Sequence, residues 1–244
     1  MSLEQVAWLS AGVFVIAVLY SSVGHAGASG YIAVMTLLGL APEAIKPAAL
    51  ALNILVAAIA AWQFRRAGHF SWPLFWPFAV AAVPMAFLGG WWQLPAPLLK
   101  TLLGLVLLYS AARFFFHVSD ERPAREPARM VSLAVGAAIG LLAGLTGTGG
   151  GIFLTPLILL MGWARAKTAA AVSALFILVN SVAGLAGNLA STQHLPAYLL
   201  ALLLAAGIGG AIGSHMGSRH FPAPIVLRLL AAVLLVAGLK LLAT

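Results

Sequence analysis

Long apolar segments alternate with short polar or glycine-rich stretches along the whole chain. With turn residues and charges as boundaries, ten apolar segments can be distinguished, near residues 6–23, 28–40, 46–64, 72–91, 97–116, 131–146, 150–162, 167–190, 197–216 and 223–243. A helix needs about 20 residues to cross a bilayer, so segments 28–40 and 150–162 are too short for a full span. The pattern predicts an all-α polytopic membrane protein with about 8–10 hydrophobic segments, two of which are short broken or re-entrant helices.

The composition supports a membrane protein and excludes several classes of function. Of the 244 residues, 63% are hydrophobic and only 7% are charged, whereas a soluble domain carries about 25% charged residues. The chain has no cysteine, which excludes disulfides, iron–sulfur clusters and thiol chemistry, and no cofactor is expected. The net charge of +8 does not predict nucleic-acid binding, because most Lys and Arg residues lie in short loops between apolar segments.

The two halves of the chain resemble each other. Three anchors recur in the same order at slowly drifting separations: a lysine that begins an Ala-rich segment (46 and 167, 121 residues apart), a histidine (69 and 194, 125 apart) and a Pro-Ala-Pro (95 and 222, 127 apart). Because chance rarely keeps anchors in order, we infer an internal duplication of five segments. The expected organisation is a first membrane repeat at 1–116, a linker at 117–130 and a second membrane repeat at 131–244.

Basic residues are distributed unequally between the two sides that this topology predicts. Apart from Arg228, which lies inside the last apolar segment, nine share the side of the linker and three lie opposite: Arg65, Arg66, Arg113, Arg122, Arg125, Arg129, Arg165, Lys167 and Arg219, against Lys46, Lys100 and Lys240. The positive-inside rule places the nine, and with them the linker 117–130, in the cytoplasm of a bacterial-type inner membrane. Since five segments is an odd number, the two halves have inverted orientations, and the substrate site is expected near the bilayer midplane.

A glycine-rich run at residues 144–151 (GLTGTGGG) interrupts the apolar pattern, and residues 23–30 (VGHAGASG) are a weaker copy of it. Irregular backbone at membrane depth is tolerated only where it is buried in protein or lines a cavity. The short segments begin directly after these breaks, so their helix N-termini, which favour anions, would point into the membrane interior. We therefore expect a substrate site at the breaks and at polar residues of the segments that follow. The candidates are Gly24, His25, Gly27, Ser29, Gly30, Asn53, Thr146, Gly147, Thr148, Gly149, Gly150, Gly151, Ser173 and Asn180.

His25 is the ionisable residue inside a break, and two interpretations of it stay open. Its imidazole could titrate near neutral pH and couple protons to transport, or it could stay neutral and bond a carbonyl. The few acidic residues lie at the ends or in loops, and no HExxH or GxSxG pattern is present. We therefore expect neither an enzyme with catalytic or metal-ligating residues nor a cation pump.

Residues 144–156 (GLTGTGGGIFLTP), followed by 165–173 (RAKTAAAVS), resemble the TauE/SafE family of membrane permeases, also called the sulfite exporter family. The resemblance covers nearly the whole chain and implies two homologous halves, each opening with a Gly-rich motif, a proline, a short loop and an Ala/Thr/Ser-rich helix. It also implies export, or in some members uptake, of sulfite, sulfonates or related small organic anions. The first half departs from this pattern, because Met35 stands where the second half has Pro156 and Asn53 replaces the expected Thr-Ser pair.

The leading hypothesis is a secondary membrane transporter, or permease, for a small anion such as sulfite, a sulfonate or a related sulfur-containing or organic anion. The anion would bind near the bilayer midplane at the Gly-rich helix breaks. The expected partners are this substrate and the lipid bilayer, without nucleic acid, and a homo-oligomer stays open. The alternative is a channel-like or assembly subunit without its own transport activity, in which the glycines serve only helix packing.

Overall fold

The computed structural model describes residues 3–40, 42–92, 108, 111–112, 125–192 and 198–243. Several features used above lie outside these residues, namely Pro95-Ala96-Pro97, Lys100, Arg113, residues 117–124 of the linker and His194. The regular elements of the described part are all helical, as the apolar periodicity predicts. They are α1 (Leu3–Ser22), α2 (Ala28–Leu37), α3 (Pro42–Arg66), α4 (Trp72–Trp91), α6 (Arg129–Thr146), α7 (Gly151–Leu160), α8 (Ala166–Thr192), α9 (Leu199–His215), the π-helical turn η1 (Met216–His220) and α10 (Ala223–Ala243).

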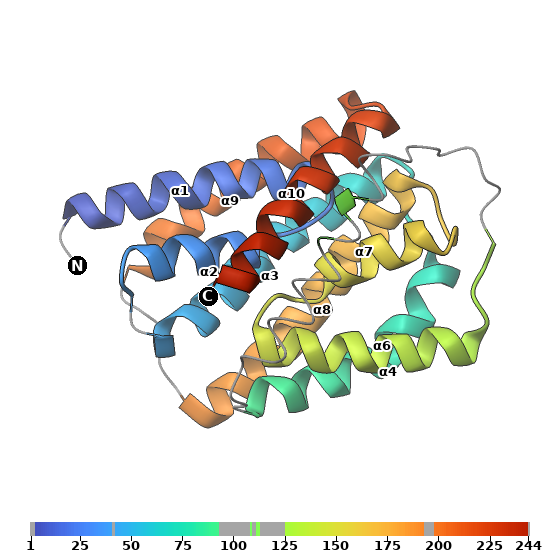
Figure 1. Ribbon diagram of the computed structural model, residues 1–244, viewed down its shortest axis with the longest axis horizontal. Helices are drawn as coiled ribbons and strands as arrows, with labels where there is room; N and C mark the ends of the chain where they lie inside the picture. The colour runs from blue at the N-terminus through green and yellow to red at the C-terminus, as the bar shows by residue number, and fades with distance from the viewer. Residues whose placement is uncertain are drawn as a thin grey trace.

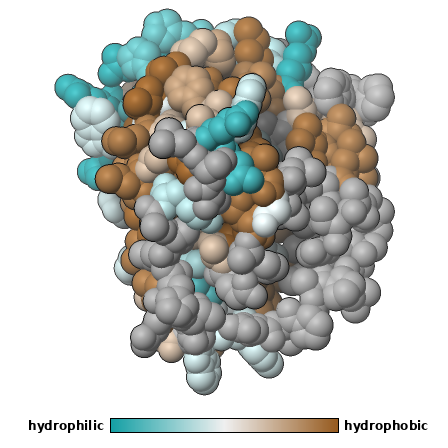
Figure 2. Space-filling view, turned by 90° about the vertical axis from the view of Figure 1, so that its left-hand side faces the viewer, coloured by the Kyte–Doolittle hydropathy of each residue, from teal (hydrophilic) through white to brown (hydrophobic). Residues whose placement is uncertain are grey.

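Membrane-spanning length is found in six helices of the described part: α1, α3, α4, α6, α8, and α9 continued by η1. Their outward faces carry large apolar side chains that water would penalise. Trp8 is 67% exposed, Trp76 62% and Leu204 61%. Figure 2 shows hydrophobic residues over much of the described surface on one side, with hydrophilic residues in separate patches. Exposed apolar surface of this extent marks contact with lipid or with another protein.

Helices α3 and α8 pack against each other and form the middle of the molecule. On one flank α1 packs against α9, which also contacts α3, and on the other flank α6 packs against α4, which also contacts α8. Figure 1 shows the α1–α9 pair and the α4–α6 pair on opposite sides of α3 and α8. Each flanking pair therefore combines one helix from each half of the chain.

Glycines allow the backbones of the two helices in each flanking pair to come into direct contact. A Cβ atom on any of three glycines of α6 would overlap a carbonyl oxygen of α4, and the same holds for three glycines of α9 and η1 against α1. The pairs are Gly136 with Phe78, Gly140 with Ala82, Gly144 with Ala86, Gly209 with Phe14, Gly213 with Val18 and Gly217 with Ser22. A repeat of four residues keeps such glycines on one face of a helix, which is how small residues bring membrane helices together.

The two short helices begin where glycines force the chain out of the preceding helix. Helix α6 ends at Thr146, and the next residue, Gly147, has a left-handed φ of 74° that lets its N–H bond the Ala143 carbonyl. Three left-handed glycines of the first half have counterparts in the second at a constant separation of 123 residues: 24 with 147, 27 with 150 and 39 with 162. Both α2 and α7 have 10 residues. In Figure 1 the chain turns back at each break, so that α2 returns beside α1 and α7 runs back from the end of α6.

Candidate functional site

The two breaks meet around His25, in the middle of the protein. The imidazole Nε2 of His25 lies 2.9 Å from the carbonyl oxygen of Gly151 and 2.9 Å from the hydroxyl oxygen of Thr155. Thr155 in turn donates a hydrogen bond of 2.7 Å to the hydroxyl of Ser173 on α8. His25 is 2% exposed and Ser173 is fully buried. These contacts connect the first break to α7 and α8 of the other half.

The tautomer of a neutral His25 follows from these partners. A carbonyl oxygen can only accept a hydrogen bond, so the nitrogen facing Gly151 must carry the hydrogen. The hydroxyl of Thr155 gives its own hydrogen to Ser173 and therefore also accepts from His25. A neutral imidazole protonated at Nε2 has a lone pair at Nδ1, and Nδ1 is buried without a hydrogen-bond partner among the described residues.

The second break is held by α3 and α8. Asn53 of α3 donates through Nδ2 to the carbonyl of Thr148 (3.2 Å) and to the hydroxyl of Ser181 on α8 (3.4 Å). Gly149 sits directly between these groups: a Cβ there would lie 2.7 Å from the Ser181 hydroxyl and 2.9 Å from Asn53 Nδ2, and its φ is 74°. Glycine is therefore required at position 149 both by space and by backbone conformation.

The hydroxyl of Thr148 is engaged within the same break. Thr146 gives its hydrogen to the Leu142 carbonyl over 2.7 Å, so the 2.8 Å contact between the two threonine hydroxyls is donated by Thr148. In this conformation the Thr148 hydroxyl has no hydrogen left to donate, and its oxygen can only accept a further hydrogen bond.

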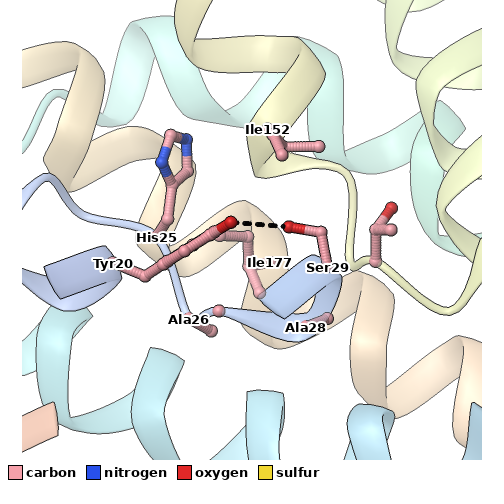
Figure 3. Close-up of a pocket in the computed structure, with 9 residues that line it drawn as sticks. Tyr20, His25, Ala26, Ala28, Ser29, Ile152 and Ile177 are labelled. Carbon is pink, nitrogen blue, oxygen red and sulfur yellow. Dashed lines mark hydrogen bonds between the residues drawn. The ribbon is translucent and has the colours of Figure 1, made fainter. Parts of the chain in front are cut away.

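A small pocket opens between the two breaks. It is lined by Tyr20, His25, Ala26, Gly27, Ala28, Ser29, Thr148, Ile152 and Ile177. Ser29 donates a hydrogen bond of 3.1 Å to the hydroxyl of Tyr20, and Figure 3 shows these two side chains reaching toward each other beside His25. The space available to the centre of a water molecule is about 10 Å³, which is room for about one water. In this conformation the pocket is therefore smaller than an oxyanion, and an oxyanion that binds here requires the two breaks to move apart.

Two helix N-termini face this pocket. Ala28 and Ser29 begin α2, and Ile152 belongs to the first turn of α7. The first N–H groups of a helix have no partner inside the helix, and the aligned peptide dipoles place about half a positive charge at that end. Every side chain lining the pocket in the described part is uncharged apart from the titratable His25 and Tyr20. The pocket thus offers hydrogen-bond donors without a fixed negative charge.

The structure sorts the residues expected from the sequence into three groups. Those that line the pocket are His25, Gly27, Ser29 and Thr148. Asn53, Thr146, Gly149 and Gly151 bond or pack against the lining residues, and Ser173 is connected to the lining residue His25 through Thr155. Packing contacts account for the rest: Gly24 against Ala170, Gly30 against Ile16, Gly147 against Lys46, Gly150 against Phe176, and Asn180, which donates to the Phe176 carbonyl of its own helix.

Tyr20 is a pocket residue that the sequence analysis missed. The available signal was its place in Tyr20-Ser21-Ser22, a polar stretch at the end of an apolar segment and just before the break. Its side chain is 5% exposed, and its hydroxyl accepts from Ser29, so that its own hydrogen stays available for a further acceptor.

Comparison with known proteins identifies the family of this chain. Residues 9–241 match the family "Sulfite exporter TauE/SafE". Over 239 residues the chain is 43% identical to the "Probable membrane transporter protein y4hK" of Sinorhizobium fredii (strain NBRC 101917 / NGR234), an alignment that covers 96% of this chain and 97% of that protein. No solved structure matches this chain. With a family match over nearly its whole length and six helices able to cross a bilayer, the chain belongs to the sulfite exporter TauE/SafE family of integral membrane transporters.

Proposed function

We propose that this transporter carries a small anion, namely sulfite, a sulfonate or a related sulfur-containing or organic anion, and binds it between the N-termini of α2 and α7. The observation that carries the proposal is that both helix N-termini face one buried pocket. An oxyanion needs hydrogen-bond donors and positive potential, and two helix N-termini supply both without a buried full charge. The name of the matching family supports sulfite as the first anion to test.

One side chain of the pocket, that of Tyr20, suits the same class of ligand. The hydroxyl of Tyr20 keeps its hydrogen for a further acceptor because Ser29 donates to it. A cation would require several oxygen ligands, often carboxylates, and no acidic side chain lines the pocket in the described part of the chain. The anion is therefore the favoured occupant.

We infer further that the two halves form an inverted repeat. The matched glycines and the equal lengths of α2 and α7 support equivalent breaks. The contacts between α3 and α8 support a two-fold relation: Asn53 bonds Ser181, while Ala60 and Ala174 share one small buried cluster. With the separation of 121 residues between the lysines at 46 and 167, Asn53 corresponds to Ala174 and Ala60 to Ser181, so the second contact is the first with the halves exchanged.

The same comparison changes one register within the repeat. Because α2 and α7 start 123 residues apart (28 and 151), Pro156 corresponds to Ala33 rather than to Met35. The separation decreases to 121 at the lysines that begin the next helices, so the second half is two residues shorter in the loop between Gly162 and Lys167.

With such a repeat we expect the site near the bilayer midplane, with α2 and α7 as re-entrant helices from opposite sides. Asn53 lies near the middle of α3, and Ser181 near the middle of α8. At one end of the protein the backbone N–H of Arg125 bonds the carbonyl of Gly162 (3.0 Å), and Lys167 bonds the carbonyl of Ser218 (3.4 Å). We infer that this end, which carries seven of the described basic residues, faces the cytoplasm of an inner membrane. They are Arg65, Arg66, Arg125, Arg129, Arg165, Lys167 and Arg219.

Transport into proteoliposomes tests the proposal. Purified protein should take up labelled sulfite or methanesulfonate down a gradient, and liposomes without protein should not. Thermal unfolding of the detergent-solubilised protein should shift upward with the same anion, since any ligand of the native state stabilises it, and choline chloride serves as the matched cationic probe. A folded protein that neither transports nor is stabilised by any anion tested would contradict the proposal and favour an assembly subunit.

A further inference from the structure

His25 lines a pocket that is otherwise suited to an anion, and its side chain carries an unused acceptor. Its Nε2–H is committed to Gly151 and Thr155, and its Nδ1 is buried without a partner among the described residues. The side chain lines the pocket together with Tyr20 and Ser29, as Figure 3 shows. A buried acceptor without a donor is costly and calls for an explanation.

An anion placed in this pocket would make that cost larger. The oxygens of sulfite or a sulfonate carry negative charge and accept hydrogen bonds, and the lone pair of a neutral Nδ1 would repel them. A proton on Nδ1 removes the conflict, because the imidazolium then donates from both ring nitrogens: Nε2–H keeps Gly151 and Thr155, and Nδ1–H is left to donate to the ligand. The bonds around His25 need no rearrangement for this step, since its Nε2 partners are already acceptors.

The other titratable groups on the surrounding helices are placed less well for this role. On α2, Tyr31 gives its hydrogen to the Ala26 carbonyl at 2.5 Å. On α3 and α8, Lys46 and Lys167 donate to the carbonyls of Gly90 (3.3 Å) and Ser218 (3.4 Å) and do not line the pocket. Helix α7 has no titratable side chain. On α1, Tyr20 lines the pocket but already has a hydrogen to donate. His25 is therefore the group that must gain a proton when an anion binds.

We propose that the pocket binds one proton together with each anion, and that this proton is held at Nδ1 of His25. The inference rests on the proposed function and names the coupling ion of the same site. The proton is taken up from water on the side from which the anion arrives and is released when the anion leaves, so no other bond is made or broken. A monovalent anion would then cross the membrane without net charge.

The experiment measures anion affinity as a function of pH. Methanesulfonate is the main probe, because it stays a monoanion throughout, and sulfite is the second. The purified wild-type protein and His25→Gln are titrated with each anion at several values between about pH 5.5 and 8, the range in which a histidine changes charge. His69→Gln is the matched control: Nε2 of His69 also faces a carbonyl, that of Ser218 at 3.1 Å, but His69 lies outside the pocket.

The wild type and His69→Gln should lose methanesulfonate affinity as pH rises, by up to about tenfold per pH unit. His25→Gln should bind with an affinity that does not depend on pH. Sulfite itself changes charge with pH, and this contribution is the same for every variant. The sulfite affinity of the wild type should therefore fall more steeply with rising pH than that of His25→Gln. Tyr20→Phe should weaken binding but keep the slope, which identifies His25 even if His25→Gln does not fold.

Two results would overturn the inference while leaving the proposed function intact. One is a wild type that binds methanesulfonate equally well at every pH, and the other is His25→Gln with the wild-type slope. If neither anion binds the folded wild-type protein at any pH, the proposed function fails, and the proton coupling fails with it.

Discussion

The imidazole Nε2 of His25 lies 2.9 Å from the hydroxyl oxygen of Thr155, although the two residues are 130 positions apart in the chain. His25 belongs to the break before α2, and Thr155 to the second turn of α7. The hydroxyl relays the contact to Ser173 on α8. A single hydrogen-bonded chain thus holds the first break against two helices of the other half.

Thr155→Val tests this chain. Valine nearly keeps the shape of threonine but leaves the buried Ser173 hydroxyl without its donor, so the protein should be destabilised by about 1–3 kcal/mol. Thr155→Ser keeps the hydroxyl and should lose less. Thermal unfolding in detergent measures both, and equal stability of Thr155→Val and wild type would show that the hydroxyl contributes nothing.

Tyr20→Phe and Tyr31→Phe form a matched pair, since each removes one buried phenolic hydroxyl near the first break. Tyr20 is expected to donate to the anion, so Tyr20→Phe should weaken binding of sulfite or methanesulfonate by about ten- to a hundredfold, the effect of one hydrogen bond to a charged acceptor. Tyr31 donates to the Ala26 carbonyl, so Tyr31→Phe should lower stability and leave affinity unchanged. The reverse result would place the anion elsewhere.

Gly140→Ala and Gly184→Ala test whether a helix glycine is required for direct contact with the backbone of a neighbouring helix. A Cβ at position 140 would overlap the carbonyl of Ala82, whereas at position 184 the nearest atom would be 3.6 Å away. Gly140→Ala should therefore destabilise the protein by about 1–3 kcal/mol. Gly184→Ala should be neutral or stabilising by up to about 1 kcal/mol, because alanine is the better helix former. Similar melting temperatures for the two variants would contradict the α4–α6 contact described here.

Cysteine labelling tests the orientation, and the cysteine-free chain needs no prior substitution. Single cysteines at the exposed positions Arg66 and Arg219 should react with a membrane-impermeant maleimide only from the cytoplasmic side. A cysteine at Trp92, beyond the other end of α4, should react only from outside. Position 122 lies outside the described residues and is expected to follow position 66. Labelling of positions 66 and 92 from the same side would exclude α4 as a full span.

Lys46 and Lys167 occupy matched places at the two ends of the protein, and each donates to a carbonyl at the end of α4 or within η1. If each attracts the anion on its own side, Lys167→Gln should raise the KM for anion supplied from the cytoplasmic face, and Lys46→Gln for anion supplied from outside. Lys→Arg at either position should retain the wild-type KM at low salt. Oriented vesicles provide the measurement, and an unchanged KM on both faces would leave the lysines as interfacial anchors.

The sequence alone was enough to predict the class of the protein and most of its helices, because these depend on local properties. Apolar runs of sufficient length, interrupted by charges and glycines, predicted an all-helical membrane protein. The breaks expected before residues 28 and 150 lie before residues 28 and 151 in the structure, since glycines that need a left-handed φ, such as Gly27 and Gly150, act on the backbone at their own position. Residues 144–156 together with 165–173 were also sufficient to predict the family.

Only the tertiary structure decided which polar residues meet. Asn53 reaches the second break, whereas Asn180, equally polar and equally buried, bonds within its own helix. Tyr20 joins His25 in the pocket, and Gly24 and Gly150 pack against side chains and backbone instead. Residues that reach the site and residues that pack elsewhere do not differ in hydropathy or residue type. What distinguishes them is the direction in which each side chain leaves its helix and the partner that lies there, more than 100 residues away in the chain, and that information exists only after the two halves have packed together.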